Sequence, residues 1–344
     1  MSSKFTYLLA AVAFASSAQA ATLVPVPAVP GAVQTFVSGI NDKNVIVGDY
    51  ENADGSMHAF YGTLDGQYTT FDFDEVNLAG TEARGIDDHG NIVGIANVDA
   101  AMSTSAYAQF ERFANGAMKR ITDHRVPTAG LTGHLSPGRA TFVVENWNED
   151  NSVSGFIGKK AKTQSQIDLG LTTTRLRPRG ITNSGDIVGF VTTGGKVQGF
   201  LLHDGTTTLL NYPDANTLIT EIEDVNADGI ITGFWEDADF NEFAFTYDEN
   251  TASFKPITIP GFPNSGAGSI NKAGLIAVQG YSADFSQSAP YIYCPKKKSK
   301  CPAGGTEIAD AQPIRMPAGG IAHRVAQGAP KPLTRAHAAV LLRQ

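Results

Sequence analysis

The chain of 344 residues carries 26 Lys and Arg against 34 Asp and Glu, which gives a formal net charge of −8 at pH 7. Residues 21–294 hold 16 basic against 32 acidic residues, whereas residues 295–344 hold 9 against 2. Because an acidic body repels nucleic acid, we exclude a nucleic-acid partner. No window reaches 18 uninterrupted apolar residues, so we also expect no membrane span.

Residues 1–20 have the pattern of an export signal. Lys4 precedes an apolar run over residues 7–14, and Ala18 and Ala20 supply the small residues of a cleavage site. The run is too short to cross a bilayer. We therefore predict a signal peptide that is cleaved after Ala20, and a secreted or periplasmic location.

One ten-residue pattern recurs along residues 21–294. It runs from Gly-Ile-Asn through a polar turn to Ile-Val-Gly, most clearly at residues 39–48, 85–94 and 180–189. Weaker copies lie at residues 224–233 and 269–278, and we assign a degraded copy to residues 146–155. The second positions of the six copies are separated by 46, 61, 34, 44 and 45 residues, which predicts a loop insertion before the third unit.

Each unit contains enough short apolar runs for four strands. In the first unit, residues 45–50, 57–64 and 67–73 alternate with turns, and the opening Gly-Ile-Asn segment adds a fourth strand. Four strands in about 45 residues is the size of a propeller blade. We predict an all-β fold, a six-bladed β-propeller of four-stranded blades. Residues 22–37 resemble the end of the fifth unit and are expected to complete the last blade and close the ring.

In the basic segment of residues 295–344, residues 303–332 are rich in Ala, Gly and Pro, and we expect a flexible extension there. A short helix over residues 334–342 stays open. Cys294 and Cys301 lie seven residues apart in an exported chain with no third Cys. This spacing predicts a local disulfide rather than a metal pair.

The first unit reads His58-Ala59-Phe60, eighteen residues after Ile40 of the first copy. With this signature the chain resembles, over residues 23–293, the bacterial extracellular repeat proteins of the HAF-repeat family. The resemblance implies export and a repeat fold, and it implies no established activity. In the other units only the aromatic residue recurs, and a repeated apolar strand position indicates core packing.

A candidate calcium loop lies in the fifth unit. Asp224, Asn226 and Asp228, followed by a glycine, match the first half of a loop in which oxygen ligands alternate. The twelfth position is Trp235, so the bidentate carboxylate that completes such a loop is out of register. Hairpin turn chemistry explains the same residues without a metal, and no other cofactor is predicted.

Two further sets of residues are candidates for binding. The same loop of units one and five carries acidic residues, namely Glu51, Asp54, Glu236 and Asp239. These residues form either an acidic rim of a binding site or ordinary solvated turns. The expected insertion, residues 128–139, adds His134 and Arg139. We predict a polar site near this insertion, with the four acids as its rim.

No catalytic motif identifies an activity. The chain has no Gly-x-Ser-x-Gly nucleophile motif and no zinc-ligand spacing. The paired carboxylates of glycoside-cleaving enzymes are close in space but not in sequence, so the sequence does not decide whether such a pair is present.

These observations favour an exported binding or scaffold module whose partner is a polysaccharide or an envelope component. The alternative is an extracellular carboxylate-based hydrolase or lyase that acts on a polysaccharide at the propeller axis. It would be recognised by two or more acids that converge with Arg or Tyr near one axis. A purely structural envelope protein is a third interpretation.

Overall fold

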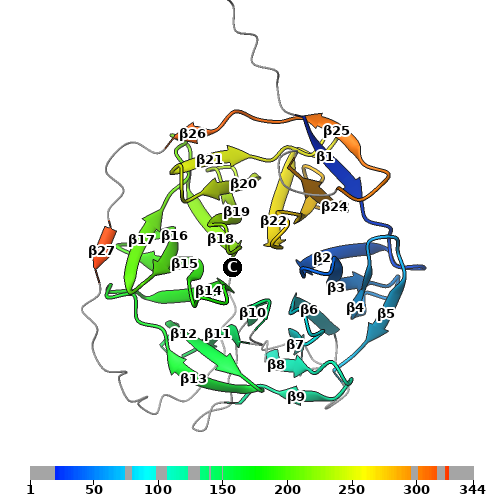
Figure 1. The fold of residues 1–344 in the computed structure, drawn as a ribbon, viewed down its shortest axis with the longest axis horizontal. Coiled ribbons are helices and arrows are strands. Elements are labelled where there is room, and N and C mark those ends of the chain that lie inside the picture. Colours follow the sequence, from blue (N-terminus) through cyan, green and yellow to red (C-terminus); the bar gives the residue numbers. More distant parts are fainter. Residues whose placement is uncertain are drawn as a thin grey trace, which may run out of the picture.

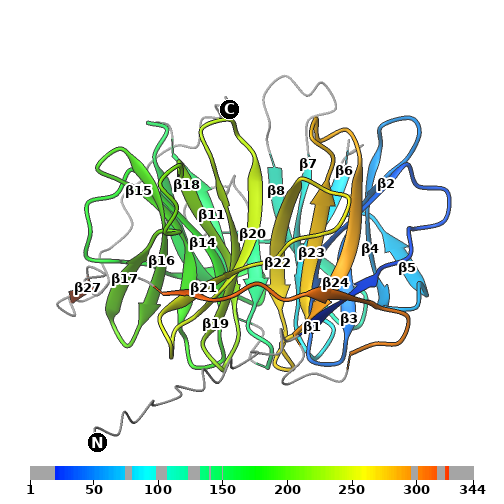
Figure 2. The same cartoon turned by 90° about the horizontal axis from the view of Figure 1, so that it is seen from above.

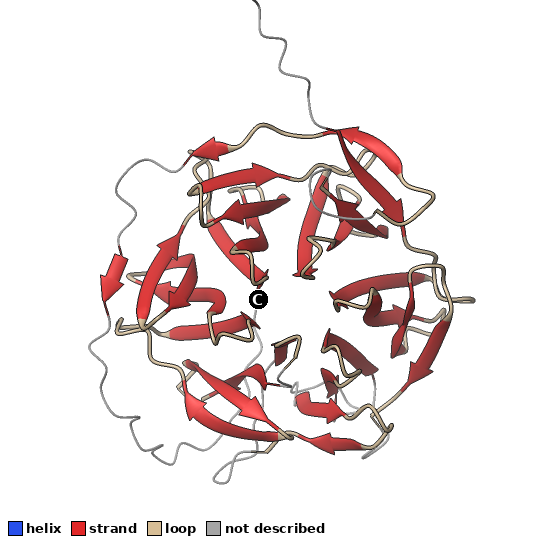
Figure 3. Ribbon diagram, viewed as in Figure 1, coloured by secondary structure: helices blue, strands red, loops and turns tan. Residues whose placement is uncertain are grey.

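The computed structural model describes residues 20–73, 80–97, 107–122, 132–138, 141–148, 150–295, 301–315 and 322–324. All regular elements in these ranges are β-strands and none is a helix, which confirms the all-β prediction (Figure 3). Accordingly, the described residues contain no helix long and apolar enough to cross a membrane. The predicted signal peptide lies outside the described residues, except for Ala20, and so does the segment of residues 334–342.

The strands form repeating antiparallel units of four. Unit one contains β2 (Gln34–Ile40), β3 (Val45–Glu51), β4 (Met57–Thr63) and β5 (Tyr68–Phe71). Unit two contains β6 (Gly80–Ile86), β7 (Ile92–Asn97), β8 (Tyr107–Arg112) and β9 (Met118–Arg120). Unit three contains β10 (Thr132–Leu135), β11 (Thr141–Trp147), β12 (Val153–Lys159) and β13 (Lys162–Gln166).

The second half of the chain repeats this arrangement. Unit four contains β14 (Arg175–Ile181), β15 (Ile187–Thr193), β16 (Lys196–His203) and β17 (Thr206–Leu210). Unit five contains β18 (Ile219–Val225), β19 (Ile230–Glu236), β20 (Glu242–Asp248) and β21 (Ser253–Pro256). Unit six contains β22 (Asn264–Ile270), β23 (Ile276–Tyr281) and β24 (Ser288–Cys294), and its fourth strand is β1 (Ala20–Pro25).

The units stand side by side around a common centre, with the first strand of each nearest that centre (Figure 1). Hydrogen bonding groups the strands into four sheets of five, nine, five and eight strands. The two larger sheets each join two units through one parallel bridge, Met57 with Gly80 and Val153 with Arg175. Inner strands such as β2, β14, β18 and β22 run between the same two faces of a thick disc, whereas β26 runs along its periphery (Figure 2). The fold is therefore β-propeller-like.

The structure corrects the register of the third unit. The six inner strands end at Ile40, Ile86, Leu135, Ile181, Val225 and Ile270, at intervals of 46, 49, 46, 44 and 45 residues. The copy assigned to residues 146–155 is wrong, because it spans the hairpin between β11 and β12. This hairpin has the turn chemistry of the true repeat, since the backbone N–H of Ser152 donates to Asp150 Oδ1 at 3.0 Å. With the register corrected, the 61-residue step and the insertion that it predicted disappear.

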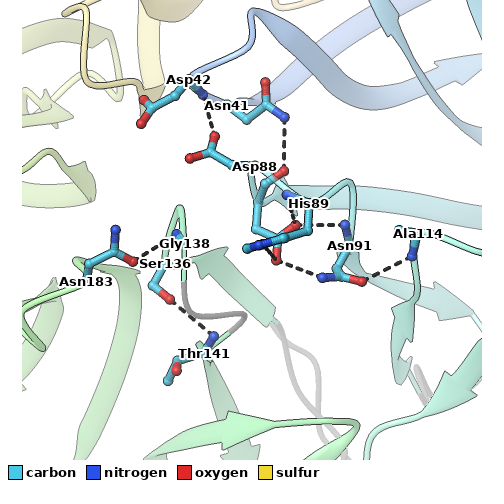
Figure 4. Close-up of polar contacts among 11 residues, drawn as sticks. Asn41, Asp42, Asp88, His89, Asn91, Ala114, Ser136, Gly138, Thr141 and Asn183 are labelled. Atoms are coloured by element: carbon cyan, nitrogen blue, oxygen red, sulfur yellow. Dashed lines mark hydrogen bonds and ion pairs between the residues drawn. The ribbon is translucent and has the colours of Figure 1, made fainter.

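The third residue of the pattern, Asn or Asp in four units, holds the first turn of the unit. Asn41 Oδ1 accepts the backbone N–H of Lys43 at 3.0 Å and of Val45 at 2.9 Å. Its Nδ2 donates to the carbonyl of Asp87 in the next unit at 2.9 Å, as Figure 4 shows together with the neighbouring contact of Asp42 and Asp88. Asx turns are a common use of these side chains, and here they also join adjacent units. The equivalent residues are Asp87, Asn226 and Asn271.

The glycine that ends the pattern is required by close packing of strands. A Cβ on Gly48 would lie 1.8 Å from the carbonyl oxygen of Phe36, and one on Gly94 would lie 2.1 Å from that of Glu82. The register of β2 and β3 shifts between Val37 and Gly39, close to this contact. Only a residue without Cβ fits where a bulged strand approaches its neighbour this closely.

The repeated aromatic residue belongs to the core, as predicted. Phe60, Phe110, Phe200 and Phe245 are each 0% exposed on the third strand of their units. His58 of the His-Ala-Phe signature lies elsewhere, with Nδ1 2.9 Å from Asp72 Oδ1. The signature is therefore explained by packing between adjacent sheets.

Unit six combines the first described strand, β1, with strands from the C-terminal part of the described chain. In the sheet, Thr22 of β1 lies opposite Cys294 of β24. The stretch of residues 22–37 that was expected to complete this unit divides between two strands, because its last four residues belong to β2. Cys294 and Cys301 form the predicted disulfide, with a Cα–Cα distance of 5.8 Å.

The expectation of a flexible extension over residues 303–332 is wrong for its described part, which contains strands. Strands β25 (Thr306–Ala309), β26 (Ile314–Arg315) and β27 (Ala322–Arg324) pair antiparallel with the outermost strands of units six, five and four. They lie at the periphery of the disc (Figure 1). An outer strand edge is an open row of hydrogen-bonding groups, and the extension covers this edge in three consecutive units.

Candidate functional site

A cavity of about 260 Å³ lies at the centre of the molecule. All six inner strands contribute to its wall, so it lies on the axis around which the units are arranged. We call it the axial cavity. Its lining residues are Val37, Ser38, Arg84, Thr132, Gly133, His134, Arg179, Glu223, Phe234, Glu242, Gly266, Ala267, Gly268, Ala277, Gln279 and Tyr281.

Strand alternation places the charged residues at the axis. Side chains two residues apart share one face of a strand. In units two, four and five the inner strand ends with charged residues at two such positions, as in Glu82 and Arg84 of β6. The corresponding pairs are Arg177 with Arg179 and Glu221 with Glu223.

The arginines of the cavity are held by carboxylates. Arg84 pairs with Glu82 on the same strand. Arg179 Nη1 lies 2.6 Å from Glu145 Oε1, and its Nε lies 3.7 Å from Glu223 Oε1. Glu145 is fully buried, and Trp147 Nε1 donates to its second oxygen at 2.8 Å. Charge-assisted hydrogen bonds of this kind fix a guanidinium in one orientation.

Three other carboxyl groups have raised pKa values, so that at neutral pH Glu221 and Asp49 are mostly protonated and Glu242 is partly protonated. Burial and the nearby Glu236 and Glu223 raise the pKa of Glu242 to about 7. Burial and Glu223 raise the pKa of Glu221 to about 8. Burial and Glu82 raise the pKa of Asp49 to about 8. A cavity wall with both protonated and ionised carboxyl groups offers donors as well as acceptors of hydrogen bonds.

Four buried side-chain atoms of the axial cavity have no hydrogen-bond partner among the described residues. They are Arg84 Nε, Thr132 Oγ1, His134 Nδ1 and Gln279 Oε1. Thr132 is 3% exposed, His134 7% and Gln279 6%. In native proteins most buried polar atoms are paired, so a group of unpaired ones around one cavity needs a partner.

The acidic loops predicted as a rim remain two separate turns. Asp54 Oδ1 accepts the backbone N–H of Ser56 at 3.0 Å and its hydroxyl at 2.7 Å. The backbone N–H of Asp239 donates to Asp237 Oδ1 at 2.9 Å within its own turn. Among the described residues no hydrogen bond or ion pair joins the two loops. Glu51 and Glu236 end β3 and β19, and Glu236 lies opposite Glu242, a residue of the axial cavity.

His134 lines the axial cavity from a strand and not from the predicted loop. It was assigned to an inserted loop, but residues 132–135 are β10, the inner strand of unit three. His134 therefore lines the axial cavity. Arg139, the other residue proposed from this segment, lies outside the described residues.

The residues of the candidate calcium loop serve the turn and the joint between units. Asp224 Oδ2 accepts Ser269 Oγ at 2.8 Å and the backbone N–H of Ile270 at 3.0 Å. Asn226 Oδ1 accepts the backbone N–H of Asp228 at 3.0 Å. These contacts explain the side chains of Asp224 and Asn226 structurally, and calcium binding by Asp224, Asn226 and Asp228 stays a prediction.

The sequence analysis did not identify Arg84, Arg179, Glu223, Glu242 and Tyr281. The sequence does contain a signal for the first three. In units two, four and five a charged residue, Arg84, Arg179 or Glu223, stands directly before the Gly-Ile or Asp-Val pair that begins the repeat pattern. Glu242 and Tyr281 come from β20 and β23 and carry no such marker. Only the arrangement of the units brings them to the axis.

No protein-family model and no curated protein sequence matches the chain. Similar solved structures include a triple arginine-to-alanine mutant of AofleA from Arthrobotrys oligospora, at 13% identity over 87% of this chain and 92% of that one, with a TM-score of 0.50. A mutant of the Aleuria aurantia lectin in complex with Fucα1-6GlcNAc has 11% identity, 83% and 97% coverage and a TM-score of 0.49.

TolB from Acinetobacter baumannii has 14% identity over 82% of this chain and a TM-score of 0.46, and the match spans 65% of the length of TolB. At these identities the likeness concerns the fold alone. The chain thus shares its all-β fold with AofleA.

Proposed function

We propose that this chain is an exported binding module that takes up one small hydroxylated ligand in the axial cavity. The observation that carries the proposal is the set of unpaired polar atoms on Arg84, Thr132, His134 and Gln279 around one cavity. Such atoms need partners from outside the described residues, and a ligand, or the waters that a ligand displaces, can supply them.

The scaffold in this proposal is a six-bladed β-propeller closed by β1. Six inner strands end at nearly equal intervals, and β1 supplies the strand that unit six otherwise lacks. Units six and one are also joined directly, since Gln279 Nε2 donates to the carbonyl of Thr35 at 3.2 Å. The His-Ala-Phe signature supports membership of the HAF-repeat family, and the disulfide supports export to an oxidising compartment.

The size and chemistry of the cavity favour a single sugar ring. Its volume of about 260 Å³ lies below the range of roughly 300–1,000 Å³ that is typical of pockets for drug-sized ligands. Gln279 Oε1 needs a donor, Arg84 Nε needs an acceptor, and the Thr132 hydroxyl can be either. Hydroxyl groups provide both functions, and Phe234 and Tyr281 supply apolar surface. The terminal residue of a polysaccharide has this combination.

The test is calorimetric titration of the native protein with a panel of monosaccharides. Gln279→Leu and Thr132→Val each remove one unpaired atom with little change of shape and should weaken binding about tenfold, the usual cost of losing one good hydrogen bond. Thr70→Val, on the exposed strand β5, is the matched control and should bind normally. Equal affinity of all variants would place the ligand elsewhere.

A second candidate function, carboxylate-based hydrolysis or elimination, is favoured by one specific observation. Glu223 and Glu242 line the same cavity as Arg84 and Tyr281, and the pKa of Glu242 is raised to about 7. A protonated acid that shares a site with an ionised carboxylate can act as general acid beside a base or nucleophile.

This candidate is tested by assaying a panel of polysaccharides for reducing ends and for unsaturated products. Glu242→Gln should abolish product formation if Glu242 is the acid, whereas Glu249→Gln, in an exposed turn of the same unit, should not. Absence of products from the whole panel contradicts the enzyme and leaves the binding module.

A further inference from the structure

The charges around the axial cavity are unevenly distributed. Both arginines of the wall already have carboxylate partners, Glu82 for Arg84, and Glu145 with Glu223 for Arg179. The side of the cavity formed by units five and six holds Glu242 and Tyr281 and contributes no cation to the wall. A buried carboxyl group without a cation is costly in its ionised form.

On β18, β19, β22 and β23 the groups around Glu242 are acidic or neutral, and β21 carries Lys255, which lies opposite Thr246 and is paired with Asp310. Glu236 lies opposite it on β19, and Glu223 comes from β18. Asn264 of β22 accepts its backbone N–H at 3.1 Å. Tyr281 of β23 has its pKa raised by burial and by Glu242, while Arg84, whose guanidinium lowers it, is engaged by Glu82. This side of the cavity therefore lacks one positive charge.

An independent observation also points to a donor from outside the chain. Gln279 Oε1, on the same strand as Tyr281, is buried and accepts no hydrogen bond. Together with the carboxylates of Glu242 and Glu223 it gives three acceptors around one cavity. An ammonium group has three donor hydrogens and no acceptor. The aromatic rings of Phe234 and Tyr281 in the same wall also attract cations.

We infer that the ligand of the axial cavity is a hydroxylated primary amine of the amino-sugar class, whose ammonium group is held by Glu242, Glu223 and Gln279. Arg84, Thr132 and His134 on the opposite units then bind the hydroxyl groups. The inference rests on the proposed binding function and adds the charge of the ligand to it.

The experiment compares glucosamine, glucose and N-acetylglucosamine by calorimetry on the native protein. The amine should bind about tenfold or more tightly than either neutral sugar, because a hydrogen bond between charged groups is stronger than one between neutral groups. Binding at pH 7 should also release protons, measured as a dependence of the heat on the ionisation enthalpy of the buffer. The proton comes from Glu242, whose pKa of about 7 falls when an ammonium group approaches.

Glu242→Gln should reduce the preference for the amine towards unity and remove the proton release. Glu249→Gln, an exposed acid of the same unit, is the matched control and should retain both. Equal or tighter binding of glucose would overturn the inference while supporting the proposed sugar site. Failure of all three sugars to bind would overturn the proposed function itself.

Discussion

At the scale of single residues, buried charge dominates the centre of the molecule. Arg179 and Glu145 are less than one-tenth exposed and 2.6 Å apart, whereas Arg84 and Glu82 form a pair that is one-quarter to two-fifths exposed. Removing one member of a buried ion pair leaves the other charge buried without a partner. At an exposed pair, water solvates the remaining charge and the cost is small. The two pairs should therefore respond differently to the same substitution.

We predict that Glu145→Gln destabilises the protein by about 3–5 kcal/mol, the usual result of breaking a buried ion pair. Glu82→Gln should cost about 1 kcal/mol or less, as expected for a partly exposed pair. Urea unfolding of both variants measures the difference. Equal losses would show that water reaches Arg179 as readily as Arg84.

A second prediction concerns the pH dependence of stability through Asp49, which is 5% exposed. Its pKa rises from 3.8 to about 8 in the folded protein, mainly because of burial. Between these values the folded state binds more protons than the unfolded state, so the free energy of unfolding falls as pH rises. The contribution of protonated Asp49 to the free energy of unfolding is complete below its pKa in the unfolded state. It is lost as pH rises through its pKa in the folded state.

Asp49→Asn removes this titration, and its stability relative to the native protein should increase from pH 5 to pH 8. Denaturant unfolding of both proteins at several pH values tests this, and taking the difference cancels the other ionisable groups. A difference that is constant with pH would mean that Asp49 titrates normally in the folded state.

At the scale of elements, each unit depends on turns and on close approach between strands. Gly48 has no room for a Cβ because the carbonyl oxygen of Phe36 would lie 1.8 Å away, whereas Gly55 has open space but a φ of +80°. The first restriction is steric overlap with backbone, and the second is local strain.

We therefore expect Gly48→Ala to cost about 3 kcal/mol, the upper part of the range for overpacking. Gly55→Ala should cost about 1 kcal/mol, as alanine does at a positive φ. Thermal unfolding of the two variants gives the ranking. A larger loss of stability for Gly55→Ala than for Gly48→Ala would contradict this ranking. It would mean that the strand bulge beside Gly48 shifts to accept a Cβ more easily than the turn at Gly55 does.

At the scale of the whole molecule, unit six is assembled from both ends of the described chain. Its sheet has the order β22, β23, β24, β1, β25, so β1 lies between two strands that follow it by more than 250 residues. Contacts of such long separation are lost together when either partner is removed. Units four and five keep all four of their own strands without the C-terminal extension.

Deletion of residues 20–25 should lower the melting temperature of the entire protein in one cooperative transition, because it exposes the edge of β24. Truncation after residue 309 removes only β26 and β27 and is the control, for which a much smaller shift is expected. Differential scanning calorimetry distinguishes the two. An unchanged melting temperature without β1 would refute the proposal that this strand closes the ring.

The sequence alone determined the repeat, because a turn held by Asn41 or Asp87 and a glycine such as Gly48 are local requirements that each copy must meet. It misplaced the third unit, because the hairpin at residues 146–155 uses the same turn chemistry as the true repeat and only strand pairing separates them. Local patterns also located the disulfide and the buried aromatic residues Phe60, Phe200 and Phe245, since pairing over seven residues and strand alternation are short-range properties.

The axial cavity was decided by tertiary structure. His134, Glu242 and Tyr281 come from three different units, and no spacing in the sequence relates them. Their chemistry arises because a ring of sheets brings strand positions from every unit to one axis, where burial and like charges raise the pKa of Glu242 and leave Gln279 Oε1 without a donor. The burial and the electrostatic environment of each residue in the axial cavity depend on all the units that surround it. The spacing of residues along the sequence does not contain this information.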